Sequence, residues 1–188
     1  EMCIRDRIES FKLQNVQKAA AVFDLKRFNW VSSQQLAKLN DEAFFDVIKP
    51  FMKDEGINED STNYKKILLA MRTSKTNLKD IAHATRPFFF ELDGYDEKGV
   101  SKFLNESLET LNFAHELLSK ITEWNETELD IALINVRDYF NLPIPKVNQP
   151  MRIALVGSTV SPSLGLTLEL FGKKKSLERI QKAIDFIS

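Results

Sequence analysis

The chain has 188 residues, of which 43% are hydrophobic, so it can bury one core or two small ones. Its low content of Gly and Pro, six of each, favours helices, and no apolar run approaches the roughly 18 residues that a membrane span needs. The single Cys3 excludes an internal disulfide and fits a reducing cytosol, and His83 and His115 show no metal-ligand spacing.

The charge is unevenly distributed along the sequence. The net charge is −1, which by itself does not indicate a protein that binds nucleic acid. Residues 143–188, however, hold seven Lys or Arg and three Asp or Glu, a net charge of +4, so the rest of the chain carries −5. Phosphate binding needs a local basic patch rather than a basic average, so the C-terminal region is the candidate for it.

Residues 8–39 are predicted to form a connector of two helices, and residues 1–7 are left out because they fit no element. Spacing places these apolar residues on one face of the first helix: Phe11, Val16 and residues 19–21. Asp24 can cap the second helix by accepting a hydrogen bond from a backbone amide. Three aromatic residues near this cap are predicted to be core: Phe23, Phe28 and Trp30.

Residues 40–142 are predicted to form a helical subdomain. Apolar residues at helical spacing predict helices in the ranges 40–51, 63–71, 77–84, 96–122 and 125–140. Thr76 is placed to cap the third of these helices. Arg86 is predicted to end it, because the residue before a proline, here Pro87, avoids helical geometry.

Two segments of this subdomain carry groups that could contact nucleic acid. The polar turn 72–76 holds two cations, Arg72 and Lys75. Simple exposure of these cations to solvent is as good an explanation as contact with nucleic acid. The aromatic run Phe88–Phe90 could stack on bases. Core packing is favoured, because aromatic residues dominate cores and the acidic segment 91–97 would repel a phosphate backbone.

Residues 143–188 are predicted to form a second, basic subdomain of helices. Residues 150–156 could be a strand or a buried helix, and the length of the apolar run leaves both open. A helix over 164–171 is closed by Gly172, and a last helix covers 176–187.

Two groups of cations in this subdomain need partners. Arg152 lies in an apolar run, where a charge usually has a partner, and a carboxylate of its own domain is as good an explanation as a ligand. Lys173, Lys174 and Lys175 precede the last helix, where each cation opposes the macrodipole by about 0.3–1 kcal/mol. A bound phosphate would make that arrangement favourable, and the alternative is a solvated charge run.

The longest ordered motif lies near the C-terminus. It reads Lys-Val-Asn-Gln-Pro-Met-Arg-Ile-Ala-Leu-Val-Gly over residues 146–157, followed by Ser161-Pro162, Leu-Glu-Leu-Phe-Gly-Lys over 168–173 and Arg179-Ile180. This series resembles the C-terminal end of bacterial glutamyl-tRNA synthetase, with Met151 where the family pattern has leucine. Residues 20–30 resemble the segment that follows the catalytic domain in that family, although residues 31–35 depart from its pattern.

The resemblance implies an all-α fold, in which a helical bundle forms an anticodon-binding cage and a small helical subdomain follows it. Residues 150–156 are then a helix. It also implies that Gln149 and Arg152 donate to base edges and that Leu164 packs on a base. The tRNA-binding residues that it implies are Gln149, Arg152, Ser161, Pro162, Leu164, Lys173, Lys174, Lys175, Arg72 and Lys75.

Catalytic chemistry is missing from the sequence. It has no glycine-rich phosphate loop, nucleophile–base set or paired carboxylates, and the HIGH-like and KMSKS-like motifs of class I synthetases are absent. The resemblance therefore implies the tRNA-binding portion of a glutamate–tRNA ligase, inactive alone and without cofactor or metal. The implied parent enzyme is a cytoplasmic monomer that uses ATP and Mg. The implied partners are the anticodon loop of tRNA(Glu) and the enzyme's own catalytic domain, with no membrane.

Two other interpretations stay open at this point. A stand-alone helical module that binds proteins and not RNA would suit the acidic first 142 residues. The helical cage of class I lysyl-tRNA synthetases is related, but the motif at residues 149–157 argues against it. RNA binding would weaken steeply with salt, whereas binding in an apolar groove would change little.

Overall fold

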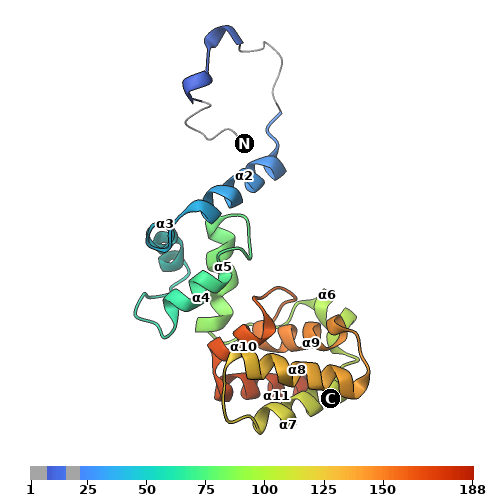
Figure 1. The fold of residues 1–188 in the computed structure, drawn as a ribbon. Coiled ribbons are helices and arrows are strands. Elements are labelled where there is room, and N and C mark those ends of the chain that lie inside the picture. The colour runs from blue at the N-terminus through green and yellow to red at the C-terminus, as the bar shows by residue number, and fades with distance from the viewer. Residues whose placement is uncertain (1–7, 16–21) are drawn as a thin grey trace.

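A computed structural model describes residues 8–15 and 22–188, and these residues form helices and connecting turns without a strand, as predicted. Figure 1 shows two packed units below a projecting helix. We call α3–α5 the α3–α5 unit and α6–α11 the C-terminal bundle. The bounds in the first part are η1 Leu13–Asn15, α2 Leu25–Lys38, α3 Asp41–Asp54, α4 Tyr64–Met71 and α5 Leu78–Phe89. Those in the bundle are α6 Glu97–Gly99, the π-helix η2 Val100–Leu104, α7 Leu108–Ser119, α8 Glu126–Phe140, α9 Ile144–Val156, α10 Leu164–Phe171 and α11 Lys173–Ile187.

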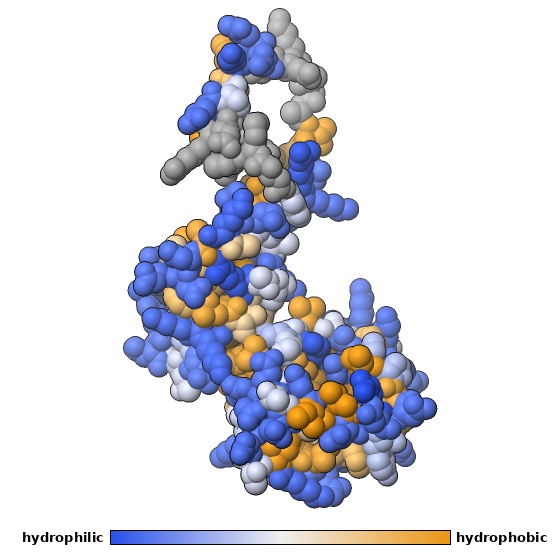
Figure 2. All heavy atoms as spheres, viewed as in Figure 1, coloured by the Kyte–Doolittle hydropathy of each residue, from blue (hydrophilic) through white to orange (hydrophobic). Residues whose placement is uncertain are grey.

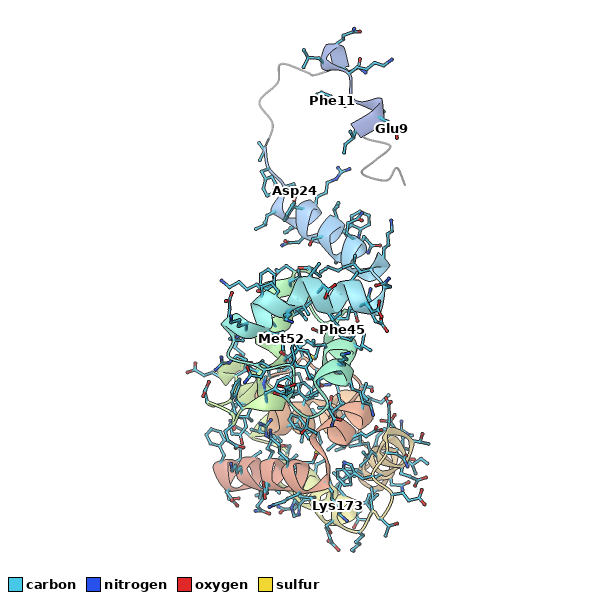
Figure 3. All side chains as sticks on the ribbon, turned by 90° about the vertical axis from the view of Figure 1, so that its left-hand side faces the viewer. Glu9, Phe11, Asp24, Phe45, Met52 and Lys173 are labelled. Atoms are coloured by element: carbon cyan, nitrogen blue, oxygen red, sulfur yellow. The ribbon has the colours of Figure 1, made fainter. Side chains whose placement is uncertain are left out.

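Helix α2 projects from the α3–α5 unit, with Asp24 at its outer end (Figure 3). The predicted cap is confirmed, because the Asp24 side chain accepts a 3.0 Å hydrogen bond from the Arg27 amide. The core prediction for three aromatic residues is wrong: the exposed fractions are 71%, 54% and 51% for Phe23, Phe28 and Trp30. No described element covers this part of α2, and its one buried residue is Leu36, near the other end. The predicted apolar positions 16 and 19–21 lie outside the described residues.

The α3–α5 unit is a three-helix core around fully buried Phe44, Ile48 and Met52 of α3. Two predictions about α5 are wrong. Its N-cap is Asn77, which accepts a 2.9 Å hydrogen bond from the Asp80 amide, so Thr76 lies one residue too early. The helix also continues through Pro87 to Phe89, because the proline falls in the last turn, where the loss of one amide donor interrupts little.

The C-terminal bundle packs α7, α8, α10 and α11 around α9. Helix α9 includes residues 150–156, which are therefore helical, and neighbouring helices bury most of its apolar residues, whereas Gln149 and Arg152 are half-buried. The predicted subdomain boundary after residue 142 falls between α8 and α9, which contact each other inside this bundle. Trp124, just before α8, donates a 2.9 Å hydrogen bond to the Leu168 carbonyl of α10.

Helices α8 and α10 approach closely at Gly165. A Cβ atom built at this glycine would lie 2.8 Å from the Glu126 carbonyl oxygen and 2.8 Å from Cγ of Asp130. The other side of α8 faces outward, and Figure 2 shows apolar residues over this part of the bundle. The exposed apolar residues there include Ile131, Ile134 and Ile144.

Figure 1 shows α5 descending to the bundle where α10 ends and α11 begins. Phe88 of α5 is buried there and stacks on Phe171 of α10, with ring centroids 4.7 Å apart, so the core prediction is confirmed for this residue. Phe90, which follows α5, is partly exposed under the Arg86 guanidinium. A second link is polar: Glu169 of α10 pairs with Lys66 of α4.

Glu169 also holds the start of α8, because its carboxylate accepts a 2.6 Å hydrogen bond from the Glu126 amide. Its bonds to Lys66 and to that amide lower the pKa of the Glu169 carboxyl below the usual 4.5. A carboxyl with a lowered folded-state pKa stabilises the protein above its unfolded-state pKa, and this stabilisation is lost as the pH falls through the folded-state value.

We therefore expect Glu169→Gln to lower the free energy of unfolding by about 1 kcal/mol at neutral pH. Because the wild-type carboxylate becomes protonated as the pH falls through its lowered folded-state pKa, the difference between the two proteins should be smaller at acid pH than at neutral pH. Urea titrations at both pH values measure this difference. A constant difference between the two proteins at both pH values would contradict it.

Candidate nucleic-acid interface

The central side chain of the candidate interface is Arg152, half-buried on α9. Its Nη1 donates to the carbonyl oxygens of Ser161 at 2.7 Å and Pro162 at 2.6 Å, and also to the Ser161 hydroxyl. All three acceptors are neutral, and no carboxylate pairs with Arg152 in the described ranges 8–15 and 22–188. The alternative of an ion pair within its own domain therefore has no support.

The electrostatics of Arg152 follow from this arrangement. Burial lowers the pKa of the guanidinium, because low polarity disfavours the charged form. An arginine nevertheless stays protonated at neutral pH. Within the described part of the chain, all of its hydrogen bonds use Nη1, so Nη2 and Nε are left as donors. A positive charge with unused donors and no carboxylate suits an incoming acceptor or anion.

The turn that Arg152 contacts is fixed from both ends. Gly157 ends α9 with φ +74°, a conformation that L side chains rarely adopt, and its carbonyl accepts a 2.8 Å hydrogen bond from the Asp96 amide. On the other side, the Thr167 hydroxyl bonds to the Ser161 hydroxyl at 3.2 Å. The segment 157–163 is thus held in place before any ligand binds.

Two other predicted residues lie near Arg152 in the sequence but differ in access. Gln149 is on α9, three residues before Arg152, so the two share a face of the helix. Its side-chain Oε1 is buried and has no hydrogen-bond partner among the described residues. Leu164 begins α10 and is only 3% exposed, so it belongs to the core and offers little surface to a base.

The three lysines do not form the predicted cluster. Helix α11 begins at Lys173 rather than at 176, so the lysines occupy its first turn and point in different directions. Lys173, at the lower edge of the bundle in Figure 3, donates to the Ile121 carbonyl at 2.7 Å. Lys175 donates to the Phe88 carbonyl at 3.2 Å, whereas the Lys174 side chain is 91% exposed and lies 4.0 Å from the exposed Glu178 carboxylate, so of the three it is the most open to a phosphate. The ammoniums of Lys173 and Lys175 thus bind backbone carbonyls, in the turn after α7 and in the last turn of α5, rather than a shared anion.

Arg72 is a structural residue in this fold. Its guanidinium lies over the Phe44 ring and donates to the carbonyls of Leu36 at 2.8 Å and of Leu39, which close the C-terminal end of α2. It also pairs with Asp41 at 3.2 Å. The solvated-turn explanation is wrong for Arg72, and few of its donors remain for RNA. Lys75 in the same turn is exposed.

A cavity of about 450 Å³ lies between the α3–α5 unit and the bundle. The turn 157–163 forms part of its wall, so the cavity adjoins the segment that Arg152 holds. Its charged and polar lining includes Lys75, Asp80, His83, Arg86, Glu91 and Ser158. Sequence reasoning missed His83 and Arg86 as possible contacts, because each is a single polar residue in its part of the helix. The helical spacing from 83 to 86 was the one signal that they share a face.

We expect Arg72→Met to lower the free energy of unfolding by about 1–3 kcal/mol, because the C-terminal carbonyls of α2 lose their donors. Lys75→Met is the matched control and should stay within about 0.5 kcal/mol of wild type. Urea unfolding measures the effect, and hydrogen exchange at the α2 amides locates it. Equal stability of the two variants would show that Arg72 does not hold α2.

Comparison with known proteins places this arrangement in a family. A family model described as "Anticodon binding domain" matches residues 43–184, which include both units and the cavity between them. The chain belongs to this family of anticodon-binding domains. The match runs from the first turn of α3 to the last turn of α11 and leaves the projecting helix α2 outside it.

The relatives of this anticodon-binding domain include glutamate–tRNA ligases. The chain is 29% identical to the glutamate–tRNA ligase of Thermodesulfovibrio yellowstonii over 95% of its own length and 40% of that protein. It is 29% identical to glutamate–tRNA ligase 1 of Caldanaerobacter subterraneus subsp. tengcongensis over 98% of the chain and 39% of that protein. The chain thus spans about two fifths of the length of the curated relatives it matches.

A solved structure agrees with the sequence relatives. The crystal structure of a glutamate tRNA ligase from Elizabethkingia meningosepticum, in complex with its amino acid, superposes with a TM-score of 0.78 at 25% identity. It matches 98% of this anticodon-binding domain chain and 37% of the solved chain. No helix in the described ranges is both long and apolar enough to cross a membrane.

Proposed function

We propose that this chain is the tRNA-recognition portion of a glutamate–tRNA ligase and that it docks the anticodon loop of tRNA(Glu). The observation that carries the proposal is the half-buried Arg152, a cation without a carboxylate partner among the described residues, held against the fixed turn at Ser161-Pro162. Single-stranded loops expose base edges, and proteins read them with positioned hydrogen-bond donors. Membership of the anticodon-binding domain family supports the same proposal.

The residues divide into those that can contact RNA and those that build the site. Arg152 supplies the free donors, Gln149 shares its helix face, and the Ser161-Pro162 turn shapes the surface between them. Lys75 and Lys174 are exposed cations suited to phosphates. Lys173, Lys175 and Arg72 build the fold instead, because backbone carbonyls already engage them.

The parent enzyme that we propose attaches glutamate to its tRNA with ATP and Mg, in the cytoplasm and as a monomer. This chain would contribute tRNA recognition, and the rest of that enzyme would supply the chemistry. No group of three or more His, Cys, Asp or Glu side chains in the described ranges is placed to hold a metal ion.

The test is the affinity of the chain for a tRNA(Glu) anticodon stem-loop and for a loop-scrambled control at two salt concentrations. We expect preferential binding of the authentic loop and a steep loss of affinity with salt. Equal affinity for both loops would reduce the interaction to phosphate attraction. Absence of binding to either loop at low salt would contradict the proposal.

A protein-binding module is the second candidate, favoured by the exposed apolar residues Ile131, Ile134 and Ile144 along α8 and the start of α9. Ile134 and Ile144, together with the buried Leu133, line a hollow of about 270 Å³. Exposed apolar patches often mark interaction sites. Binding through this surface would change little with salt and would be lost in Ile134→Asp, whereas stem-loop binding would not change in that variant.

A further inference from the structure

The C-terminal ends of two helices converge on α11. Arg179 of α11 is 2% exposed, and its Nη2 donates to the Phe90 carbonyl at the end of α5, at 2.7 Å. Its Nη1 donates to the Leu155 carbonyl in the last turn of α9. One guanidinium therefore joins the α3–α5 unit to the C-terminal bundle.

Lys175, one helical turn earlier on α11, repeats this arrangement. Its Nζ donates to the Phe88 carbonyl in the last turn of α5, at 3.2 Å. Both cations lie over the ring of Phe171, Arg179 at 4.5 Å and Lys175 at 5.5 Å from its centroid. That ring also stacks on Phe88, so cations and rings join the same two units.

The stability of α11 by itself does not explain why Lys175 and Arg179 lie near its N-terminal end. Cations in the first turns of a helix oppose its macrodipole, and burial lowers the pKa of both Lys175 and Arg179. No carboxylate forms an ion pair with either of them in the described part of the chain. What they satisfy is a set of helix C-terminal carbonyls, which lack partners within their own helices and carry partial negative charge.

The two walls of the cavity belong to the two units that this contact joins. Lys75 and Arg86 come from the side of α5, and Ser158 and Val160 come from the bundle. Units of one chain move relative to each other by default unless a large apolar interface holds them. The separation of the two walls therefore depends on the contact between α5 and α11.

We propose that Lys175 and Arg179 are positioning residues that fix the orientation of the α3–α5 unit on the C-terminal bundle, and so set the spacing between the two halves of the anticodon-binding surface. This inference rests on the proposed function for its second half only. The fixed orientation itself does not depend on RNA.

The experiment measures a distance between spin labels in the full chain. Labels at Asp46→Cys on α3 and Asn135→Cys on α8 report the orientation of the two units, in a Cys3→Ser background that removes the one native thiol. A second pair, Asn112→Cys and Asn135→Cys, lies within the bundle and reports its integrity. We expect Arg179→Met and Lys175→Met to broaden the first distance distribution and leave the second narrow.

Lys174→Met is the matched control, because this neighbouring lysine is exposed and touches neither α5 nor α9 through a hydrogen bond in the described ranges. It should leave both distributions unchanged. If Arg179→Met unfolds the bundle, as the second pair would show, Lys175→Met decides the question. An unchanged first distribution in a folded Lys175→Met protein would overturn the inference.

The link to RNA is tested with the same variants and the two stem-loops. We expect the preference for the authentic loop over the scrambled loop to fall by about tenfold in Lys175→Met, the equivalent of one misplaced base contact. A broadened distance distribution together with an unchanged preference for the authentic loop would overturn the role of Lys175 in anticodon recognition. A wild-type chain without loop preference would instead contradict the proposed function, and the distance measurement would still test the fixed orientation.

Discussion

Arg152→Ala is expected to weaken binding of the authentic anticodon stem-loop by about 1–3 kcal/mol, and binding of the scrambled loop much less. The reason is that Arg152 supplies both the donors that remain free and the hydrogen bonds that hold Ser161 and Pro162 in place. Its removal loses a base contact and loosens the turn. Fluorescence anisotropy with both stem-loops measures the change in loop preference.

Two further variants separate the contributions of Arg152. Ser161→Ala removes one hydroxyl acceptor and leaves both carbonyl acceptors, so it should have a small effect. Lys174→Ala should weaken both stem-loops by a similar factor, since a phosphate contact carries no sequence information. A folded Arg152→Ala protein with unchanged loop preference would rule out this assignment.

Gly165→Val is expected to lower the free energy of unfolding by about 3 kcal/mol, because α8 and α10 cross at this residue and any side chain would overpack the contact. The Glu126 carbonyl lies 2.8 Å from the position that a Cβ would occupy, and it belongs to a helical backbone that cannot move alone. Urea unfolding followed by circular dichroism gives the magnitude.

The sign of the stability change in Gly165→Ala tests the same close contact. In an open helical position, replacing glycine by alanine stabilises a protein by about 1 kcal/mol. At this crossing we expect a loss of stability instead, smaller than that of the valine variant. Stabilisation by alanine would show that the two helices have room at Gly165.

Sequence reasoning located most of the helices because the signals are local. The Asp24 cap, the apolar spacing of α4 and the glycine after α10 each act within a few residues. The errors arise where the partner is distant in sequence. Thr76 and Asn77 are both good capping residues, and position in the turn decides between them. The burial of α9 depends on the helices that surround it, which come from distant parts of the sequence.

The candidate site was predictable to a smaller degree. The motif made Arg152 and the Ser161-Pro162 turn candidates together, but only the hydrogen bonds of Arg152 show that its partners among the described residues are neutral oxygens rather than a carboxylate. The lysines at 173–175 looked alike in sequence, and two of them are engaged by the Ile121 and Phe88 carbonyls, more than 50 residues away in the chain. The spacing of residues along the sequence does not predict such long-range hydrogen bonds.

The two tryptophans of the chain lie in separate parts of the fold, and this has a practical consequence for spectroscopy. Trp30 is half exposed on α2, whereas the Trp124 indole is hydrogen bonded to α10 within the bundle. In a Trp30→Phe protein, intrinsic emission would come from Trp124 alone and would report the melting of the bundle. The converse variant, Trp124→Phe, would report the surroundings of α2. Emission from a single chain can thus follow its two ends separately, without an added label.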